Sequence, residues 1–517
     1  MLFNSFEFIF LFLPVSLAGY FLLARYSTFE MALGFLVLAS LFFYGYWNPA
    51  YLLLILFSIV FNFAIGRRLA IGQSSTNRFL FLLGIVVNLS LLGYFKYANF
   101  FVDNLNAVLG THWSIGNIFL PLAISFFTFQ QISYLVDAWQ GKTSEYNFLH
   151  YCLFVCFFPQ LIAGPIVHHR EILPQFMRPE NLSPNWSNFA VGVSIFALGL
   201  FKKTVIADSL SVYVSPVYDT TGGEIDFFLA WGSTLAYTFQ LYFDFSGYSD
   251  MAVGCARMFG VRLPVNFFSP YKSTSIIEFW RRWHITLSRF LRDYLYIALG
   301  GNRKGRYRRY VNLFLTMLLG GLWHGAGWPF VVWGALHGTY LMINHGWKKL
   351  TDTANFNLVD NRLYTTFCWA VTFVAVVFSW VYFRAPTLEQ ANHIALAMLG
   401  QSGFELPAGI LARIGGVASV LAELGIEPAN GGGAIFIANY VWILAAAVVA
   451  FFMPNVAQIF HRYDPVLYES ARSFHDQRSS AFWTWDYSRP WALVVSIAFL
   501  AGVLTLMQVS EFLYFQF

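Results

Sequence analysis

Charged residues are scarce in this chain. Asp, Glu, Lys and Arg make up 11% of its 517 residues, against about 25% in an average soluble protein. Hydrophobic residues reach 58% and aromatic residues 20%. So few charges cannot cover a water-soluble surface, and so much apolar content excludes a disordered chain. The composition therefore predicts a polytopic membrane protein.

Cysteines are few, and the common hydrolase motifs are missing. No C-x-x-C, G-x-S-x-G or H-E-x-x-H pattern occurs, which argues against a zinc hydrolase or a soluble-type serine hydrolase and predicts no metal and no bound cofactor. No basic region precedes the first apolar run, so we expect Phe8–Ala24 to be a retained helix and not a cleaved signal. Each cysteine lies in or beside an apolar stretch, and we interpret all four as packing residues: Cys152, Cys156, Cys255 and Cys368.

Long apolar runs predict a single all-α membrane domain over residues 1–517. A helix that crosses a bilayer needs about 20 apolar residues, and no internal repeat is visible. Ten runs fit: Phe8–Ala24, Met31–Tyr46, Tyr51–Gly66, Phe79–Phe95, Ile118–Val136, Phe148–Val167, Phe227–Phe243, Leu363–Phe383, Ala434–Phe452 and Trp491–Met507. Three more are short or interrupted: Phe189–Phe201, Tyr310–Trp323 and Trp328–Ile343. Together they predict about 11–13 transmembrane and re-entrant helices.

Basic residues predict how the chain crosses the membrane. Residues 244–309 hold 12 of the 31 Lys and Arg residues, which predicts a cytoplasmic or re-entrant region. The net charge of +5 then reflects cytoplasmic loops and not nucleic-acid binding. Residues 384–433 have two basic residues, so we expect this segment on the outer side of the membrane, which is the periplasmic side if the membrane is a bacterial inner membrane. The count of crossings fails between Phe148 and Phe243, which predicts a re-entrant segment there and a cavity beside it.

Ser275–Gly300 has apolar residues at spacings of three and four, which predicts one continuous amphipathic helix. Arg281 and Arg282 lie mainly off its apolar stripe. One interpretation is an interfacial helix whose arginines meet lipid headgroups. The other is that these arginines also hold an anionic donor that arrives from the cytosol.

His324 lies in the run LLGGLWHGAGWP, between two of the short apolar stretches. The first of these, Tyr310–Trp323, would form about 21 Å of helix and would end inside the bilayer. The surrounding glycines allow close helix contact, so the run predicts a hairpin whose apex presents an imidazole at membrane depth. A neutral buried imidazole can accept a proton from an attacking hydroxyl. A packed, hydrogen-bonded histidine at a helix kink explains the same pattern.

Two runs resemble the membrane-bound O-acyltransferase family, in its alginate O-acetylation branch. They are LYFDFSGYSDMAVGCARMFGVRLPVNFFSPYKSTSIIEFWRRWHITLSRFLRDYLYIALGGNRKG and LLGGLWHGAGWPFVVWGALHG. The resemblance covers essentially the whole chain. It implies a ring of tilted helices around a central tunnel in a locally thin membrane. It also implies that His324 is the catalytic histidine and that His284, in WRRWH, occupies the second motif position. Asp244, Ser246, Trp323 and Trp328 lie in the same runs, and we expect them to line the tunnel.

The leading hypothesis is an O-acetyltransferase of the bacterial inner membrane. Its donor would be a cytosolic acetyl thioester such as acetyl-CoA, and the final acceptor an exported polysaccharide, alginate or similar. The resemblance implies that a periplasmic acetyltransferase partner completes the reaction. Arginine forms forked contacts with phosphate oxygens, so a donor site would suit the basic residues, although membrane topology alone also explains them: Arg281, Arg282, Arg303 and Lys304.

Two alternatives stay open. The protein could carry an acetylated solute without bond chemistry, and His324 would then only line the path. It could instead transfer D-alanine from a carrier protein to teichoic acid. The segment 384–433 favours the polysaccharide branch over this second alternative, because the D-alanyl relatives that the chain resembles are shorter.

Overall fold

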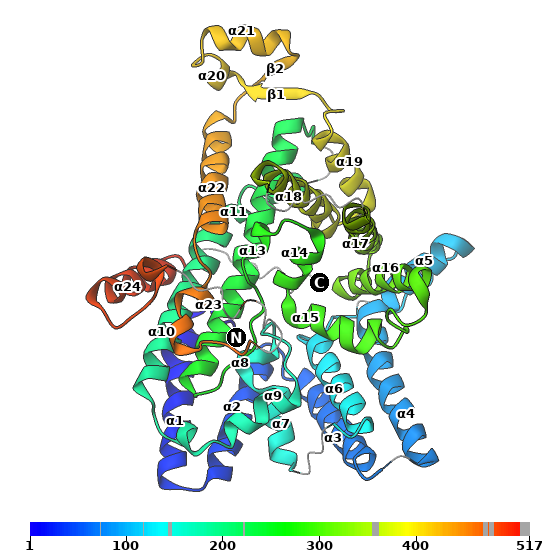
Figure 1. The fold of residues 1–517 in the computed structure, drawn as a ribbon, viewed down its shortest axis with the longest axis vertical. Helices are drawn as coiled ribbons and strands as arrows, with labels where there is room; N and C mark the ends of the chain where they lie inside the picture. The colour runs from blue at the N-terminus through cyan, green and yellow to red at the C-terminus, as the bar shows by residue number, and fades with distance from the viewer. Residues whose placement is uncertain are drawn as a thin grey trace.

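Helices make up most of the structure, a computed structural model (Figure 1). It describes residues 1–506 except Gln73, Asn117 and residues 143–146, 221–222, 354–360, 469–473 and 475–479. Six of the described helical segments are long and apolar enough to cross a membrane, and two further apolar helices are shorter. The protein is an all-α polytopic membrane protein, with one small two-stranded sheet that the sequence did not predict.

The first four predicted spans coincide with helices, whereas the predicted span Ile118–Val136 begins before its helix, which starts at Ile124. Thr28 caps the start of α2 by accepting a hydrogen bond from the Met31 N–H, and Ser74 caps α4 in the same way through Asn77. The elements are η1 (Phe8–Phe12), α1 (Leu13–Tyr26), α2 (Phe29–Gly45), α3 (Tyr51–Leu69), α4 (Ser75–Leu92), η2 (Gly93–Tyr97), α5 (Ala98–Leu109) and α6 (Ile124–Trp139). The π-helical turn η2 joins α4 and α5 into one helical segment of 35 residues.

The predicted span Phe148–Val167 is wrong. This stretch forms two short buried helices, α7 (Phe148–Cys156) and α8 (Phe158–Leu161), followed by α9 (His169–Phe176) and η3 (Pro179–Leu182). Nine residues of α7 give about 14 Å of helix, which is too short for a hydrocarbon core of about 30 Å. Helix α7 also packs against α9, and the re-entrant segment expected between Phe148 and Phe243 stays a prediction.

A long central helix, α13 (Phe227–Met258), packs along α10 (Trp186–Phe201). Small residues allow this contact: a Cβ atom on Gly192 would lie 2.7 Å from the Gly254 carbonyl oxygen, and one on Gly199 would lie 2.7 Å from that of Gly247. Close backbone approach of this kind is typical of membrane helix pairs. The connection contains η4 (Lys202–Ala207), α11 (Asp208–Ser211) and α12 (Ser215–Tyr218). Residues 244–258 of the predicted cytoplasmic region therefore continue a buried helix.

Ser275–Gly300 is not one continuous helix. It contains α14 (Ile276–Arg282), α15 (Ile285–Phe290) and η6 (Leu291–Tyr296), after the short η5 (Pro270–Lys272). Two longer helices follow, α16 (Gly305–His324) and α17 (Trp328–Thr353), and pack against each other as the predicted hairpin.

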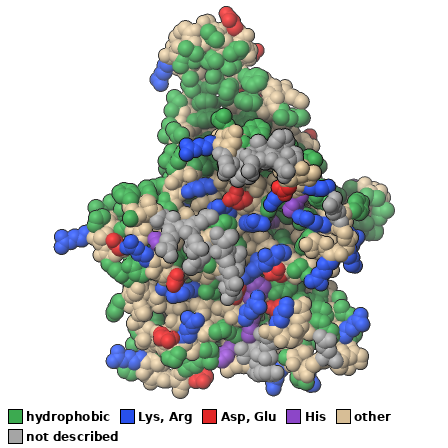
Figure 2. Space-filling model, in the orientation of Figure 1, with side chains coloured by type: hydrophobic (Ala, Val, Ile, Leu, Met, Phe, Trp, Pro, Cys, Tyr) green, Lys and Arg blue, Asp and Glu red, His purple; other side chains and the backbone are tan. Residues whose placement is uncertain are grey.

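Residues 404–429 project away from this core at the top of Figure 1. Strands β1 (Phe404–Pro407) and β2 (Ile426–Ala429) pair in parallel and frame α20 (Ala408–Leu411) and α21 (Gly416–Glu423). The remaining elements are α18 (Arg362–Arg384), α19 (Leu388–Met398), α22 (Gly433–Phe452), α23 (Val456–Ile459), η7 (His461–Tyr463), η9 (Ala481–Trp483) and α24 (Arg489–Leu504). Lys and Arg side chains gather across the middle of the face in Figure 2 and are fewer on the projection.

Candidate active site

The hairpin of α16 and α17 carries His324 at its apex. His324 is the last residue of α16, and α17 begins four residues later at Trp328. The two helices touch through glycine: a Cβ atom on Gly321 would lie 2.3 Å from the Phe330 carbonyl oxygen, and one on Gly334 would lie 2.5 Å from that of Met317. Only glycine permits this contact at both positions, and it brings α17 directly beside the histidine.

Aromatic rings enclose the His324 side chain, which is 4% exposed. The ring centroids of Trp323, Trp333 and Phe383 lie 4.8, 5.1 and 5.1 Å from that of the imidazole. The main chain of the same turn is held by another helix segment, because the Lys96 ammonium donates to the carbonyl oxygens of Trp323 and His324. The imidazole is thus fixed in a largely apolar surrounding.

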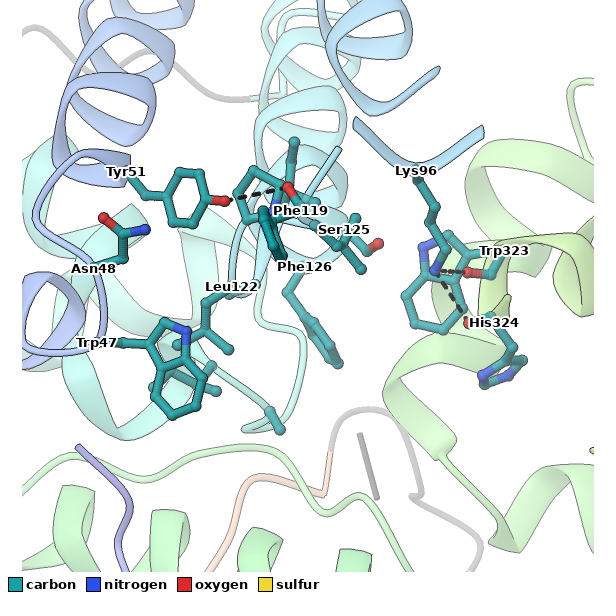
Figure 3. Close-up of a pocket in the computed structure, with 16 residues that line it drawn as sticks. Trp47, Asn48, Tyr51, Lys96, Phe119, Leu122, Ser125, Phe126, Trp323 and His324 are labelled. Carbon is teal, nitrogen blue, oxygen red and sulfur yellow. Dashed lines mark hydrogen bonds between the residues drawn. The ribbon is translucent and has the colours of Figure 1, made fainter. Parts of the chain in front are cut away.

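A cavity of about 450 Å³ opens beside this histidine. His324, Trp323 and Lys96 line one side of it, and residues 119–126 before and at the start of α6 line another (Figure 3). Trp47, Asn48 and Tyr51, from the α2–α3 connection and the start of α3, line its far side. The basic residues Arg67 and Arg68 lie at the opposite end of α3. The cavity therefore lies toward the end of α3 that carries no basic residues, and it extends from there to Trp323 and His324.

His284 is fully buried because the helix around it is broken. Helix α14 ends at Arg282, Trp283 is extended, and His284 has a left-handed backbone with φ of 42°. The break is fixed by the preceding loop, where the Ile285 N–H donates to the Asn266 carbonyl oxygen at 2.9 Å. The Asn266 side-chain oxygen lies 3.0 Å from Nδ1 of His284. The prediction of one continuous helix is wrong because this long-range pairing replaces helical hydrogen bonds.

The two motif histidines come together around one indole. The Trp323 ring centroid lies 6.5 Å from that of His284 and 4.8 Å from that of His324. Segments that are 40 positions apart in the sequence thus meet at Trp323, which lines the cavity, whereas His284 is fully buried and is not among the lining residues. His337 is nearby but is committed to packing, since its Nδ1 accepts from Trp280 at 3.3 Å and its Nε2 lies 2.9 Å from the Ser379 hydroxyl.

The four predicted donor-binding residues differ in their freedom to bind a ligand. Arg282 is engaged within the protein: it pairs with Glu278 at 2.8 Å and stacks 4.7 Å from the Phe474 ring centroid. Arg281, Arg303 and Lys304 are exposed. Arg281 lies at the end of α14 and Lys304 at the N-cap of α16. The exposed residues are the better candidates for a phosphate contact.

Of the four residues expected to line the tunnel, Trp323 lines the cavity beside His324, and Asp244, Ser246 and Trp328 do not. Trp328 is exposed, and its indole N–H donates to Asn104 of α5 at 2.9 Å. Asp244 and Ser246 are buried in α13, and Ser246 lines a much smaller polar cavity. Asp244 pairs with Lys203 at 2.7 Å.

Sequence reasoning missed three polar groups, of which Lys203 and Asn266 are buried and Lys96 is partly buried. Lys203 lies in η4 and pairs with Asp208 at 2.6 Å as well as with Asp244. Lys96 lines the cavity, and Asn266 orients His284. The rule that ionisable residues at membrane depth are functional candidates would have selected both lysines from their apolar neighbours. Among the described residues, no group of three or more His, Cys, Asp or Glu side chains could hold a metal ion.

Comparisons with known proteins match this arrangement to one enzyme family. The membrane-bound O-acyltransferase family profile matches residues 140–385, a range that includes both His284 and His324. The chain is 46% identical over 433 residues to the peptidoglycan O-acetyltransferase of Helicobacter pylori, with 78% of this chain and 81% of that protein covered. The chain belongs to the membrane-bound O-acyltransferase family.

Further relatives of this acyltransferase are named probable alginate O-acetylase. The protein from Pseudomonas fluorescens is 38% identical over 542 residues, which cover all of both chains. That from Pseudomonas putida is 44% identical over 418 residues, with 78% of this chain and 82% of that protein covered. The protein is therefore a multi-pass membrane acyltransferase of the alginate O-acetylation branch, as its motifs indicated.

Proposed function

We propose that this acyltransferase moves acetyl groups from a cytosolic thioester, such as acetyl-CoA, toward an exported polysaccharide, with His324 as general base. The observation that carries the proposal is the position of His324. Its imidazole is buried at the hairpin apex, and the residue lies at the wall of a cavity that reaches the end of α3 opposite Arg67 and Arg68. By the positive-inside rule, that end faces the periplasm.

The chemical step transfers an acyl group from the thioester sulfur of the donor to a hydroxyl oxygen of the acceptor. The acceptor hydroxyl oxygen attacks the thioester carbonyl carbon, the new C–O bond forms, and the C–S bond breaks. His324 takes the hydroxyl proton and returns it to the leaving thiolate, so that a thiol and an ester are the products. A positioned base of this kind contributes about 10²–10⁴-fold to the rate. His284, held by Asn266 at 3.0 Å, would orient the donor beside Trp323.

The acceptor is proposed from the chemistry of the relatives. Their names specify peptidoglycan and alginate, both of which are carbohydrates with free hydroxyl groups outside the cytoplasm. We therefore expect a glycan hydroxyl as the final acceptor. The hydroxyl that attacks the thioester would then belong to a periplasmic acetyltransferase or a group that it delivers, and this partner would pass the acetyl group from that ester to the glycan hydroxyl, which regenerates the first hydroxyl.

The test uses inverted membrane vesicles, whose cytoplasmic face is accessible, from cells that make this protein and its exported glycan. The vesicles receive [¹⁴C]acetyl-CoA, and both the released CoA thiol and the label in carbohydrate are measured. His324→Ala should lower both by about 10² or more at equal protein level. His393→Ala is the matched control, because this histidine is exposed on α19.

Each alternative predicts a different outcome. If His324→Ala transfers acetyl groups at the wild-type rate, His324 is not the base. If label crosses the membrane while no CoA thiol is released, the protein is a transporter. If a D-alanyl-loaded carrier protein is used as donor and acetyl-CoA is not, the acyl group is D-alanine.

A further inference from the structure

Lys96 reaches the active-site helix from a distant part of the chain. It lies in the π-helical turn η2 between α4 and α5. Its ammonium donates to the carbonyl oxygens of Trp323 and His324, the latter at 3.1 Å, and lies 5.6 Å from the Trp323 ring centroid (Figure 3). Single π-helical turns are frequent at functional sites. This one places the Lys96 side chain against the main chain of Trp323 and His324, at the end of α16.

The physical need for such a contact follows from the end of a helix. The last four carbonyl groups of any α-helix have no partner within it. In α16, three consecutive ones are satisfied by η2: Leu322 accepts from the Tyr97 hydroxyl at 2.8 Å, and Trp323 and His324 accept from Lys96. A cation is also favourable at this end of the helix dipole. The last turn of α16 is thus held by a neighbouring segment.

Lys96 also lines the cavity itself. It is the single Lys or Arg among the described lining residues, and no Asp or Glu is among them. Its ammonium has three N–H donors, and the two carbonyl oxygens fix the position of the side chain on the wall beside the imidazole.

We propose that Lys96 is a positioning residue for the acyl transfer: it holds the main chain of Trp323 and His324 and so fixes where the buried imidazole lies. The inference rests on the proposed function of His324. A purely structural cap would affect only how much protein folds. A positioning residue also affects the rate of each folded molecule, because a displacement of about 1 Å can cost about 10²-fold in rate.

The experiment compares three variants in the vesicle assay, with rates normalised to folded protein. Lys96→Met, which keeps the length but removes the charge and its donors, should lower the turnover number by about 10- to 100-fold. The apparent KM for acetyl-CoA should stay within about twofold, because the donor is expected on the cytosolic side. Lys96→Arg keeps a cationic donor and should recover at least part of the turnover. Asn104→Ala removes a different contact between α5 and the hairpin, to the exposed Trp328, and should leave turnover near wild type.

The outcomes separate this inference from the proposed function. Wild-type turnover in Lys96→Met, with His324→Ala inactive, overturns the role of Lys96 and leaves His324 as the base. An equal loss in Lys96→Met and Asn104→Ala also overturns it, because any contact to the hairpin would then suffice. A His324→Ala variant with wild-type activity removes the proposed function itself.

Discussion

Replacing Gly321 by alanine tests whether the close contact of α16 and α17 places His324. A Cβ atom there would lie 2.3 Å from the Phe330 carbonyl oxygen and 2.9 Å from the Gly334 Cα. Both neighbours are backbone atoms, which cannot rotate away. Ordinary van der Waals contact begins at 3.4 Å, so the two helices must separate by about 1 Å within one turn of His324.

The expected cost has two parts. Overpacking of a buried contact destabilises a protein by about 1–3 kcal/mol. A shift of about 1 Å at the base costs about 10²-fold in rate. Gly320→Ala is the matched control, because its Cβ would meet only the end of the Leu291 side chain, at 3.2 Å. Alanine also favours helix by about 1 kcal/mol relative to glycine, which offsets the tight contact with Leu291. The Gly320→Ala variant should therefore keep wild-type stability and rate.

The assay is the rate of CoA release in vesicles, with the thermal midpoint of the purified protein measured in parallel. Gly321→Ala should lower both, and Gly320→Ala neither. The reasoning would be refuted by a Gly321→Ala protein with wild-type rate and midpoint. It would equally fail if the two alanine variants were damaged to the same extent, since their contacts differ.

Two further predictions concern the donor and the topology. If the exposed arginines bind the phosphates of acetyl-CoA, Arg281→Lys and Arg303→Lys should each raise its apparent KM several-fold, because lysine cannot form the forked contact. Unchanged KM values in both variants would leave membrane topology as the role of these arginines. Arg282→Lys should change KM less, since Arg282 is held by Glu278. A cysteine at exposed Asn302 should react with an impermeant maleimide only after the inner membrane is opened, because we expect this residue in the cytoplasm. A cysteine at exposed Ser402 should react in cells whose outer membrane alone is permeable, because we expect this residue in the periplasm. The reverse pattern would contradict both assignments.

Local features of the sequence were enough to predict the membrane class, most spans and the hairpin. Apolar runs report burial along a single helix, so α3 and α18 appear almost as their compositions predict. The short run before His324 and its glycines likewise predicted the apex of α16 and α17, because length and side-chain size act within the hairpin itself. The crossing count predicted an irregular crossing between Phe148 and Phe243, and the two short helices α7 and α8 lie in that stretch.

Contacts between distant segments decided the geometry of the active site. Helical periodicity made residues 275–300 one amphipathic helix, whereas pairing with Asn266 breaks it and buries His284. No local pattern could show this, because the competing hydrogen bonds come from a loop outside the helix. The motifs predicted which histidines matter, but not how they are held.

Lys96 shows most clearly what the sequence predicts and what only contacts between distant segments decide. Its sequence neighbours identify a lysine in an apolar helix, an expensive placement that calls for a partner. The sequence does not say which partner, because Lys96 and His324 are 228 positions apart. Composition and local pattern determined that this chain is a membrane protein with a histidine at membrane depth, and the family motifs indicated an acyltransferase. The tertiary structure alone decided that a cation from η2 holds that histidine at a cavity wall, since hydrogen bonds and packing depend on distance in space and not along the chain.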